Sequence, residues 1–109
     1  DSKVTATCVR VPIMRAHSES LNIEFEKPYT IEAAYEILKD APGVEIFEDR
    51  EANLCATPLD VSGKDPVYVG RLRRDKTIDN GLELWLVGDQ VRKGAALNAV
   101  QIAELLLED

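Results

Sequence analysis

The sequence predicts an α+β domain in which a mostly antiparallel sheet is covered on one face by helices. Its strand-like and helix-like segments follow the order β-β-α-β-β-β-α, and strands that neighbour one another along the chain are typical of this fold class. The length of 109 residues suits one domain at the small end of the usual range. The content of 45% hydrophobic and 30% charged residues is that of an ordinary globular chain.

The first part of the chain contains two predicted strands and a helix. Residues 4–13 are rich in β-branched side chains, which favour a strand. Pro12 places a bend, a bulge or a sheet edge there, because proline lacks the N–H of a ladder hydrogen bond. Residues 19–26 alternate apolar and polar side chains, as a half-buried strand does. Apolar residues at helical spacing predict a helix over residues 31–41, with Thr30 as its N-cap.

The middle of the chain predicts three more strands. Residues 44–47 form a short apolar run, and residues 49–65 have the charge, Asn, Pro and Gly content of a long surface loop. Two β-rich segments follow, residues 67–74 and 82–87. They are joined through Asp79-Asn80-Gly81, whose Asn-Gly pair favours the tight turn of a hairpin.

The last predicted element is a helix over residues 90–107, opened by Asp89 as its N-cap. Its apolar residues lie on nearly all sides: Val91, Ala95, Ala96, Ala99, Val100, Ile102, Ala103, Leu105, Leu106 and Leu107. A helix of this kind is buried on most sides in a folded protein. We therefore expect it to lie against further protein, and the chain to self-associate.

Charge and composition exclude several classes of partner. A net charge of −7 leaves no broad basic face for nucleic acid or an anionic membrane. The row Arg71, Arg73 and Arg74 is a local exception, interpreted as a solvated strand face, with an interface or phosphate site as the alternative. No apolar run approaches the ~20 residues of a membrane helix, and no signal or transit peptide is visible. Cys8 and Cys55 have no metal-ligand spacing, so we predict reduced thiols and no metal site.

His17 is the strongest candidate for chemistry. It is the only histidine, and histidine titrates near neutral pH. It follows the proline-containing break, and Arg15 and Glu19 bracket it at strand spacing. Backbone irregularity at such a place often aims a functional side chain. The alternative is a solvated or internally satisfied histidine.

Arg10 is the second candidate, because its guanidinium suits bidentate capture of a carboxylate or phosphate. A charge within an apolar strand must be paired or must face a cleft. In an unbroken strand Arg10 and His17 would face opposite sides, so they converge only if the chain bends near Pro12 or Met14. Cys8 would share the side of Arg10, and we interpret it as a buried structural residue.

The third candidate place is Gly88-Asp89-Gln90, where the predicted last helix begins. Free N–H groups at a helix N-terminus attract polar or anionic ligands. Residues 94–96, Gly-Ala-Ala, would let another surface approach closely. The alternative is plain capping with tight helix packing.

Three ordered groups of motifs resemble the C-terminal part of aspartate-semialdehyde dehydrogenases, and the resemblance extends over essentially the whole chain. They are Thr7-Cys8-Val9-Arg10-Val11-Pro12 with Ala16-His17-Ser18-Glu19, Thr57-Pro58-Leu59-Asp60-Val61 with Val69-Gly70-Arg71-Leu72-Arg73, and Gly88-Asp89-Gln90 with residues 92–104. The amino-acid sequences of these motifs most resemble those of plant and cyanobacterial members.

The resemblance implies an NADP-dependent enzyme on the route to lysine, threonine, methionine and isoleucine. Such an enzyme interconverts aspartyl phosphate with aspartate semialdehyde and phosphate. It implies that Arg10 grips the substrate carboxylate, that His17 is the acid–base residue, and that Gln90 contacts the dinucleotide. It also implies part of the C-terminal domain of the glyceraldehyde-3-phosphate dehydrogenase-like fold, a homodimer, and a location in the cytoplasm, or in the plastid stroma of a plant or alga.

Family members are much longer than this chain. Their Gly-rich dinucleotide loop and their nucleophilic cysteine, which forms the thioester that NADPH reduces, match nothing here; Cys8 belongs to the arginine motif. We therefore expect residues 1–109 to be a single partial domain, the C-terminal portion of the catalytic and dimerisation domain. Without the nucleotide-binding domain and the nucleophile it should be inactive alone. The rival interpretation is a non-catalytic dimerisation or binding module with the same fold.

Overall fold

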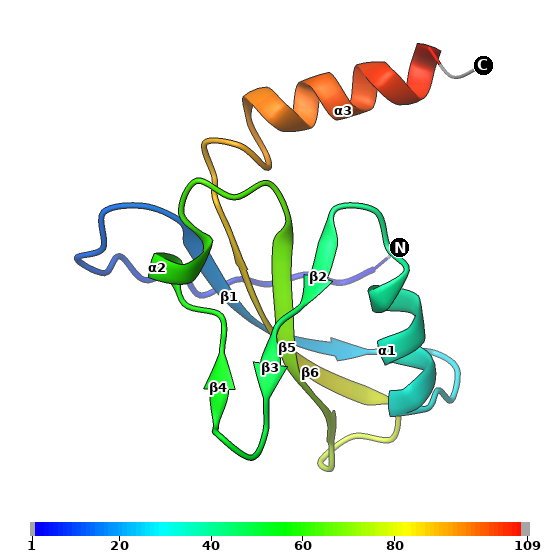
Figure 1. Ribbon diagram of the computed structural model, residues 1–109. Coiled ribbons are helices and arrows are strands. Elements are labelled where there is room, and N and C mark those ends of the chain that lie inside the picture. The colour runs from blue at the N-terminus through cyan, green and yellow to red at the C-terminus, as the bar shows by residue number, and fades with distance from the viewer. Residues whose placement is uncertain (1, 108–109) are drawn as a thin grey trace.

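The computed structural model describes residues 2–107, and its main feature is a four-stranded sheet in the order β1-β6-β5-β2 (Figure 1). β1 (His17–Glu24) pairs with β6 (Gly81–Gly88), and β6 pairs with β5 (Val67–Asp75), both antiparallel. β5 pairs in parallel with β2 (Val44–Ile46). The predicted α+β class with a mostly antiparallel sheet is confirmed.

The larger hydrophobic core lies between one face of this sheet and α1 (Ile31–Lys39). Strand side chains alternate between the two faces, so every second residue of β1 and β6 points at α1. The buried members are Val69, Leu72, Leu82 and Leu84, and α1 adds Ile31, Ala34, Tyr35 and Leu38. Thr30 caps α1 as predicted, because its Oγ1 accepts a hydrogen bond from Ala33 N at 3.1 Å.

A smaller core lies on the opposite face of the sheet. Its buried members are Ala16, Ala56, Val61, Tyr68 and Val87. Trp85 packs against this cluster, and its Nε1 donates to the carbonyl of Ala56 at 2.9 Å. The cluster joins the residue before His17 to the centre of the sheet, so it holds the start of β1 in place.

The predicted loop 49–65 contains three short elements. β3 (Glu48–Asp49) and β4 (Leu54–Cys55) form a two-stranded hairpin, and α2 (Pro58–Val61) is one helical turn that supplies Val61 to the smaller core. Asp60 Oδ2 accepts from Thr57 N at 2.9 Å, which fixes the start of α2. Elements this short show too few residues for a period to be visible in the sequence.

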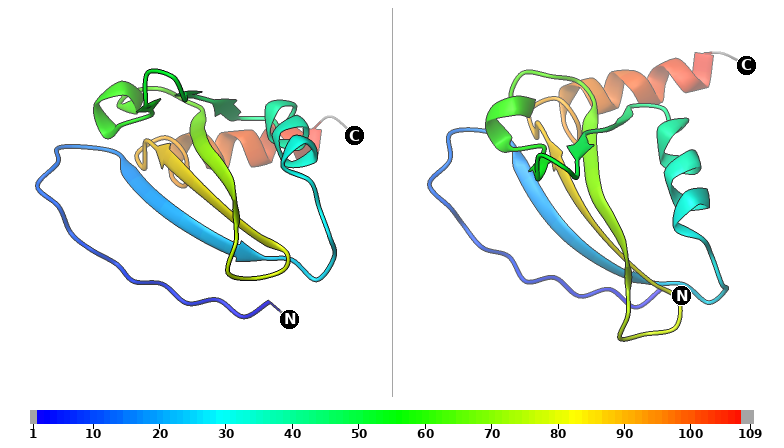
Figure 2. Two further views of the ribbon diagram at one scale, coloured as in Figure 1. Left: turned by 90° about the horizontal axis from the view of Figure 1, so that it is seen from below. Right: turned by 60° about the horizontal axis from the view of Figure 1, so that its bottom comes forward.

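The predicted strand over residues 4–13 is wrong. This segment is extended and exposed, and it runs back along the outside of β1 without joining the sheet (Figure 2). A strand exists only with a hydrogen-bonded partner, and within residues 2–107 no strand pairs with it. The predicted bend is present, at Pro12 and again at Met14 and Arg15.

The last helix begins later than predicted. α3 spans Ala96–Leu107, and residues 90–95 form turns that end in Gly94, whose φ is +87°. A left-handed residue interrupts a right-handed helix, so Asp89 caps the turn rather than α3. α3 projects away from the sheet (Figure 1) and has no buried residue in the part of the chain that the structure describes. The predicted burial of this helix is therefore not achieved within one chain.

β5 contains a bulge that the sequence did not reveal. Gly70 pairs with Trp85 and Arg73 with Glu83, so two residues of β5 stand opposite Leu84. Arg71, in the bulge, has a left-handed φ of +57°. The extra residue sends Leu72 into the larger core and leaves Arg71 exposed.

Candidate functional site

His17 is the first residue of β1 and pairs with Gly88, the last residue of β6. Its side chain is exposed. By strand alternation His17 and Glu19 share one face. Arg15 does not continue this polar row, because the left-handed backbone of Ala16 separates it from the strand.

Ala16 forms the left-handed turn directly before His17. Its φ is +77°, a conformation that costs a residue with a Cβ about 1–2 kcal/mol, and it is only 2% exposed. Its N–H donates to Gln90 Oε1 at 2.8 Å. Strained backbone persists only where its surroundings over-determine it, and here both packing and a hydrogen bond do so.

Asp89 is fully buried, and its carboxylate contacts three segments of the chain. Its Oδ2 lies 2.7 Å from Arg15 Nε and accepts from Gly63 N at 2.6 Å, while its Oδ1 accepts from Val91 N at 2.9 Å. Burial raises the pKa of the Asp89 carboxyl, but the two backbone hydrogen bonds and the Arg15 guanidinium outweigh burial and set the pKa below its ordinary value. The carboxylate is therefore the stable form.

The N–H groups expected to attract a ligand already have partners at residues 91–93. Val91 N binds the Asp89 side chain, and the amides of Arg92 and Lys93 donate to the Asp89 carbonyl at 3.1 and 2.9 Å. The expected helix N-terminal anion site is thus satisfied by Asp89 itself. The side chain of Gln90 can still donate to a ligand, since only its Oε1 is hydrogen-bonded among residues 2–107.

The structure brings together two of the three predicted site positions. Gln90 is bonded to the residue directly before His17. Arg10 lies in the exposed segment ahead of the bends, and in the described part of the chain no ion pair includes it. Cys8 is exposed rather than buried, which corrects its interpretation as a core residue, because its segment packs on no sheet. Cys55 is a free, partly buried thiol.

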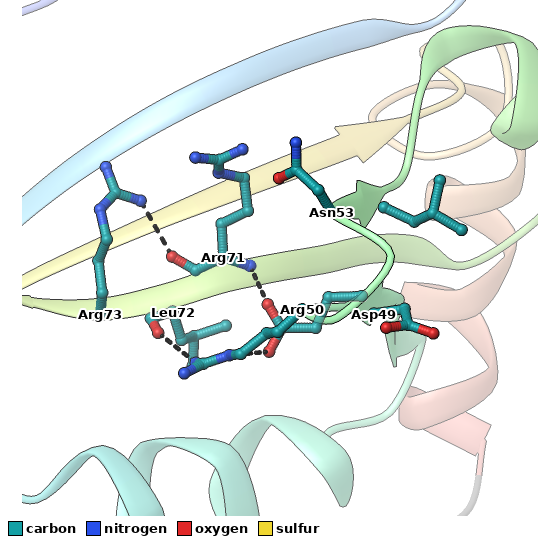
Figure 3. Close-up of a pocket in the computed structure, with 8 residues that line it drawn as sticks. Asp49, Arg50, Asn53, Arg71, Leu72 and Arg73 are labelled. Atoms are coloured by element: carbon teal, nitrogen blue, oxygen red, sulfur yellow. Dashed lines mark hydrogen bonds and ion pairs between the residues drawn. The ribbon is translucent and has the colours of Figure 1, made fainter.

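Two members of the arginine row, Arg71 and Arg73, line a shallow pocket of about 220 Å³ at the β3–β4 hairpin together with Arg50. Figure 3 shows Arg71 and Arg73 extending on the side of β5 where Asn53 lies. Arg73 Nη2 is 2.6 Å from Glu83 Oε2, and Glu48 accepts from the backbone N–H of Arg71. Glu48 and Asp49 also line the pocket, so carboxylates offset much of its positive charge.

Among residues 2–107, no group of three or more His, Cys, Asp or Glu side chains is arranged to hold a metal ion. None of the described helices combines the length and the apolar character that crossing a bilayer requires.

Comparisons with known proteins identify the family. Residues 1–93 match the family described as "Semialdehyde dehydrogenase, dimerisation domain". The chain is 57% identical to an aspartate-semialdehyde dehydrogenase of Synechocystis over 99% of its own length and 32% of the relative. It is 60% identical to the enzyme of that name from Prochlorococcus marinus over 95% of its length and 30% of the relative. The chain thus spans about a third of the length of the curated relatives that it matches.

Solved structures agree with this assignment. The crystal structure of aspartate semialdehyde dehydrogenase II from Vibrio cholerae, complexed with ASA, superimposes with a TM-score of 0.81 at 43% identity, and the match covers 91% of this chain and 29% of that one. A probable aspartate-semialdehyde dehydrogenase from Pseudomonas aeruginosa gives a TM-score of 0.77 at 35% identity, with 88% and 28% covered. The fold and the motifs point the same way, and this chain belongs to the semialdehyde dehydrogenase family, with residues 1–93 in its dimerisation domain.

Proposed function

We propose that these 109 residues are the C-terminal portion of the catalytic and dimerisation domain of an NADP-dependent aspartate-semialdehyde dehydrogenase, acting in the cytoplasm. The full-length enzyme would reduce aspartyl phosphate to aspartate semialdehyde and phosphate on the route to lysine, threonine and methionine. The observation that carries the proposal is identity of 57–60% to enzymes of this name over nearly the whole chain.

The geometry around His17 supports an acid–base role. Its imidazole is exposed at the start of β1, while the backbone before it is held by a part-buried hydrogen bond. An exposed ring on a fixed backbone can exchange a proton with a bound partner without moving the fold. Arg10 lies in the exposed segment that precedes β1. It would supply a forked cation for the substrate carboxylate once a ligand or further protein contacts it there.

Gln90 fits part of a dinucleotide site. Its Oε1 is engaged by Ala16 N, which orients the carboxamide and directs its Nε2 donors elsewhere. NADPH, when bound, supplies the hydride. The contribution of Gln90 would be to hold the cofactor through these donors, and most of the dinucleotide contacts would come from a nucleotide-binding domain elsewhere in the full-length protein.

None of the 109 residues matches the nucleophile of the family, so we propose that turnover needs a cysteine from the rest of the enzyme. The test is NADPH formation from aspartate semialdehyde, NADP and phosphate. The 109-residue chain should give none, while a full-length enzyme that contains it should be active. Turnover by the short chain would make Cys8 the suspected nucleophile and would overturn these roles.

Substitutions in the full-length enzyme separate this proposal from a non-catalytic binding module. His17→Ala and Arg10→Ala should abolish turnover while the protein still folds, and Gln90→Ala should raise the KM for NADP. Under the rival function, none of the three changes would affect anything except stability. An unchanged KM for NADP in Gln90→Ala would remove the cofactor role of that residue alone.

A further inference from the structure

The acid–base mechanism leaves one buried charged group unused, the carboxylate of Asp89. Its side chain is 0% exposed, and that of its partner Arg15 is 40% exposed. A buried carboxylate is expensive to desolvate and is kept only where paired and hydrogen-bonded. Capping of the 90–93 turn needs only the acceptor that Val91 uses. The second oxygen of Asp89 holds Arg15 and Gly63, and these contacts require a different explanation.

Two side-chain contacts continue the β1–β6 pair beyond its last ladder position. The ladder ends at His17 opposite Gly88. The two residues before His17 contact the two residues after Gly88. Arg15 forms an ion pair with Asp89, and the backbone N–H of Ala16 donates to the side chain of Gln90. The backbone at Ala16 is left-handed and cannot extend a regular ladder. Side chains therefore replace the backbone hydrogen bonds that the strands can no longer make.

We propose that the Arg15–Asp89 ion pair and the Ala16–Gln90 hydrogen bond form a clamp whose role is to position His17 and the Gln90 carboxamide relative to each other. Arg15 and Asp89 are positioning residues, and neither needs to touch a substrate. The inference rests on the proposed function for the role of His17 in catalysis, but the clamp itself is a statement about geometry and can be tested without turnover.

The Arg15–Asp89 contact holds the chain on the side of the strained Ala16 turn that precedes it. Packing of the Ala16 methyl and the Gln90 hydrogen bond hold Ala16 itself. Without the Arg15 contact, the exposed segment that leads into the turn would be free to swing, and the imidazole one residue further on would swing with it. Asp89→Asn would place an amide NH2 opposite both Gly63 N and the Arg15 guanidinium or, with the amide flipped, opposite Val91 N, so that in either orientation one donor faces another.

The chain offers a probe that needs no assignment, since His17 is its only histidine. The experiment records the NMR signals of the imidazole C–H groups and the hydrogen exchange of the Ala16 amide in the 109-residue chain. The variants are Arg15→Gln, which removes the ion pair at a partly exposed position, and Asp89→Asn. Arg15→Lys is the conservative rescue. Asp65→Asn is the matched control, because it breaks the Arg92–Asp65 ion pair of the same 90–95 turn.

Arg15→Gln should shift and broaden the His17 signals and speed exchange of the Ala16 amide by about tenfold, the loss expected when one part-buried hydrogen bond opens. Arg15→Lys should restore most of both, and Asp65→Asn should change neither. Trp85 fluorescence should remain native in Arg15→Gln, which separates a local effect from unfolding. If Asp89→Asn fails to fold, Arg15→Gln decides alone. His17 signals that are the same in Arg15→Gln and Asp65→Asn would overturn the clamp.

Kinetics of the full-length enzyme distinguish the two proposals. Arg15→Gln should lower kcat with little change in the KM for aspartate semialdehyde, and Arg15→Lys should recover it. If His17→Ala keeps full turnover, the proposed catalytic role of His17 fails, and the clamp is then judged from the NMR and hydrogen-exchange results alone. If His17→Ala is inactive but Arg15→Gln has normal kcat and normal His17 signals, the positioning role fails and the proposed function survives.

Discussion

Ala16 combines a left-handed backbone with a buried side chain. Replacement by glycine removes a backbone strain of about 1 kcal/mol and loses one buried methyl of about 0.8 kcal/mol, so Ala16→Gly should leave stability nearly unchanged. The same substitution at the exposed helical Ala33 lowers stability by up to about 1 kcal/mol. Ala16→Val should be the worst of the three, since a β-branched residue fits neither this φ nor this packing.

Urea unfolding followed by the fluorescence of Trp85, the only tryptophan, measures all three variants. The contrast is informative because Ala→Gly has different effects at the two positions for a purely conformational reason. A loss in Ala16→Gly that equals or exceeds the loss in Ala33→Gly would contradict the left-handed turn before His17.

The lowered pKa of Asp89 predicts an acid limb in the stability of the chain. Its folded-state pKa lies below the ordinary value of 3.8, so the carboxylate contributes stability that is present above that value. This contribution is lost as the pH falls through the lower, folded-state pKa, where the native protein must also take up the proton. Asp89→Asn should flatten the acid limb of a plot of unfolding free energy against pH. An unchanged slope would show that other carboxylates dominate it.

At the residue scale, the sequence indicated which side chains could carry chemistry but not how they are joined. Arg10, His17 and Gln90 were singled out by residue type and local context, and their roles remain predictions. From residue type and spacing, Arg15 was assigned only to a polar row and Asp89 only to a capping role. Their contact depends on the register between β1 and β6, which single-sequence patterns do not determine. Given the pairing of His17 with Gly88, the contact joins the residue two positions before His17 to the residue one position after Gly88.

Gly70 shows how tightly the elements of the sheet and hairpin approach one another. A Cβ on Gly70 would lie 2.7 Å from the backbone oxygen of Phe47, and backbone cannot move aside as a flexible side chain can. Gly70→Ala should lower stability by about 1–3 kcal/mol, the usual effect of forced overpacking. Gly88→Ala is the matched control, because its Cβ would meet nothing closer than 3.4 Å. Equal midpoints in urea for both variants would contradict this close approach.

At the element scale, the prediction succeeded where apolar residues form a continuous run or follow a clear period. β1, α1, β2, β5 and β6 all coincide with predicted elements to within a few residues. It failed for residues 4–13, because β-branched composition measures suitability for a sheet and says nothing of whether a partner strand is present. It also failed at the start of α3, where Gly94 was interpreted as a small packing residue and instead interrupts the helix with a positive φ.

At the scale of the whole molecule, α3 is the feature that a single chain leaves unexplained. Its residues Val100, Ile102, Leu105, Leu106 and Leu107 are 53–83% exposed. Apolar surface gathered on one helix in this way favours association. The match to the dimerisation-domain family covers residues 1–93 and ends before α3, so association through α3 is inferred from this exposed surface alone. We expect the 109-residue chain to self-associate, with a mass that rises with concentration.

Sedimentation or light scattering over a concentration series measures this, and Leu105→Glu with Leu106→Glu should shift the chain toward the monomer. Leu59→Glu is the control, since Leu59 is 89% exposed but lies in α2. A wild-type chain that stays a monodisperse monomer at high concentration would rule out self-association. An equal shift from Leu59→Glu would assign it to general hydrophobicity rather than to α3.

The clamp beside His17 also has a consequence in time. Ala16 and Gln90 are 74 residues apart in sequence, and contacts over such separations close late because the intervening chain must first be ordered. During synthesis the segment with Arg10 and His17 leaves the ribosome well before β6 and Gln90, which follow only after β2 and β5. The histidine therefore remains unfixed until β6 docks beside β1, and a nascent chain would acquire its site as one of the last events of folding.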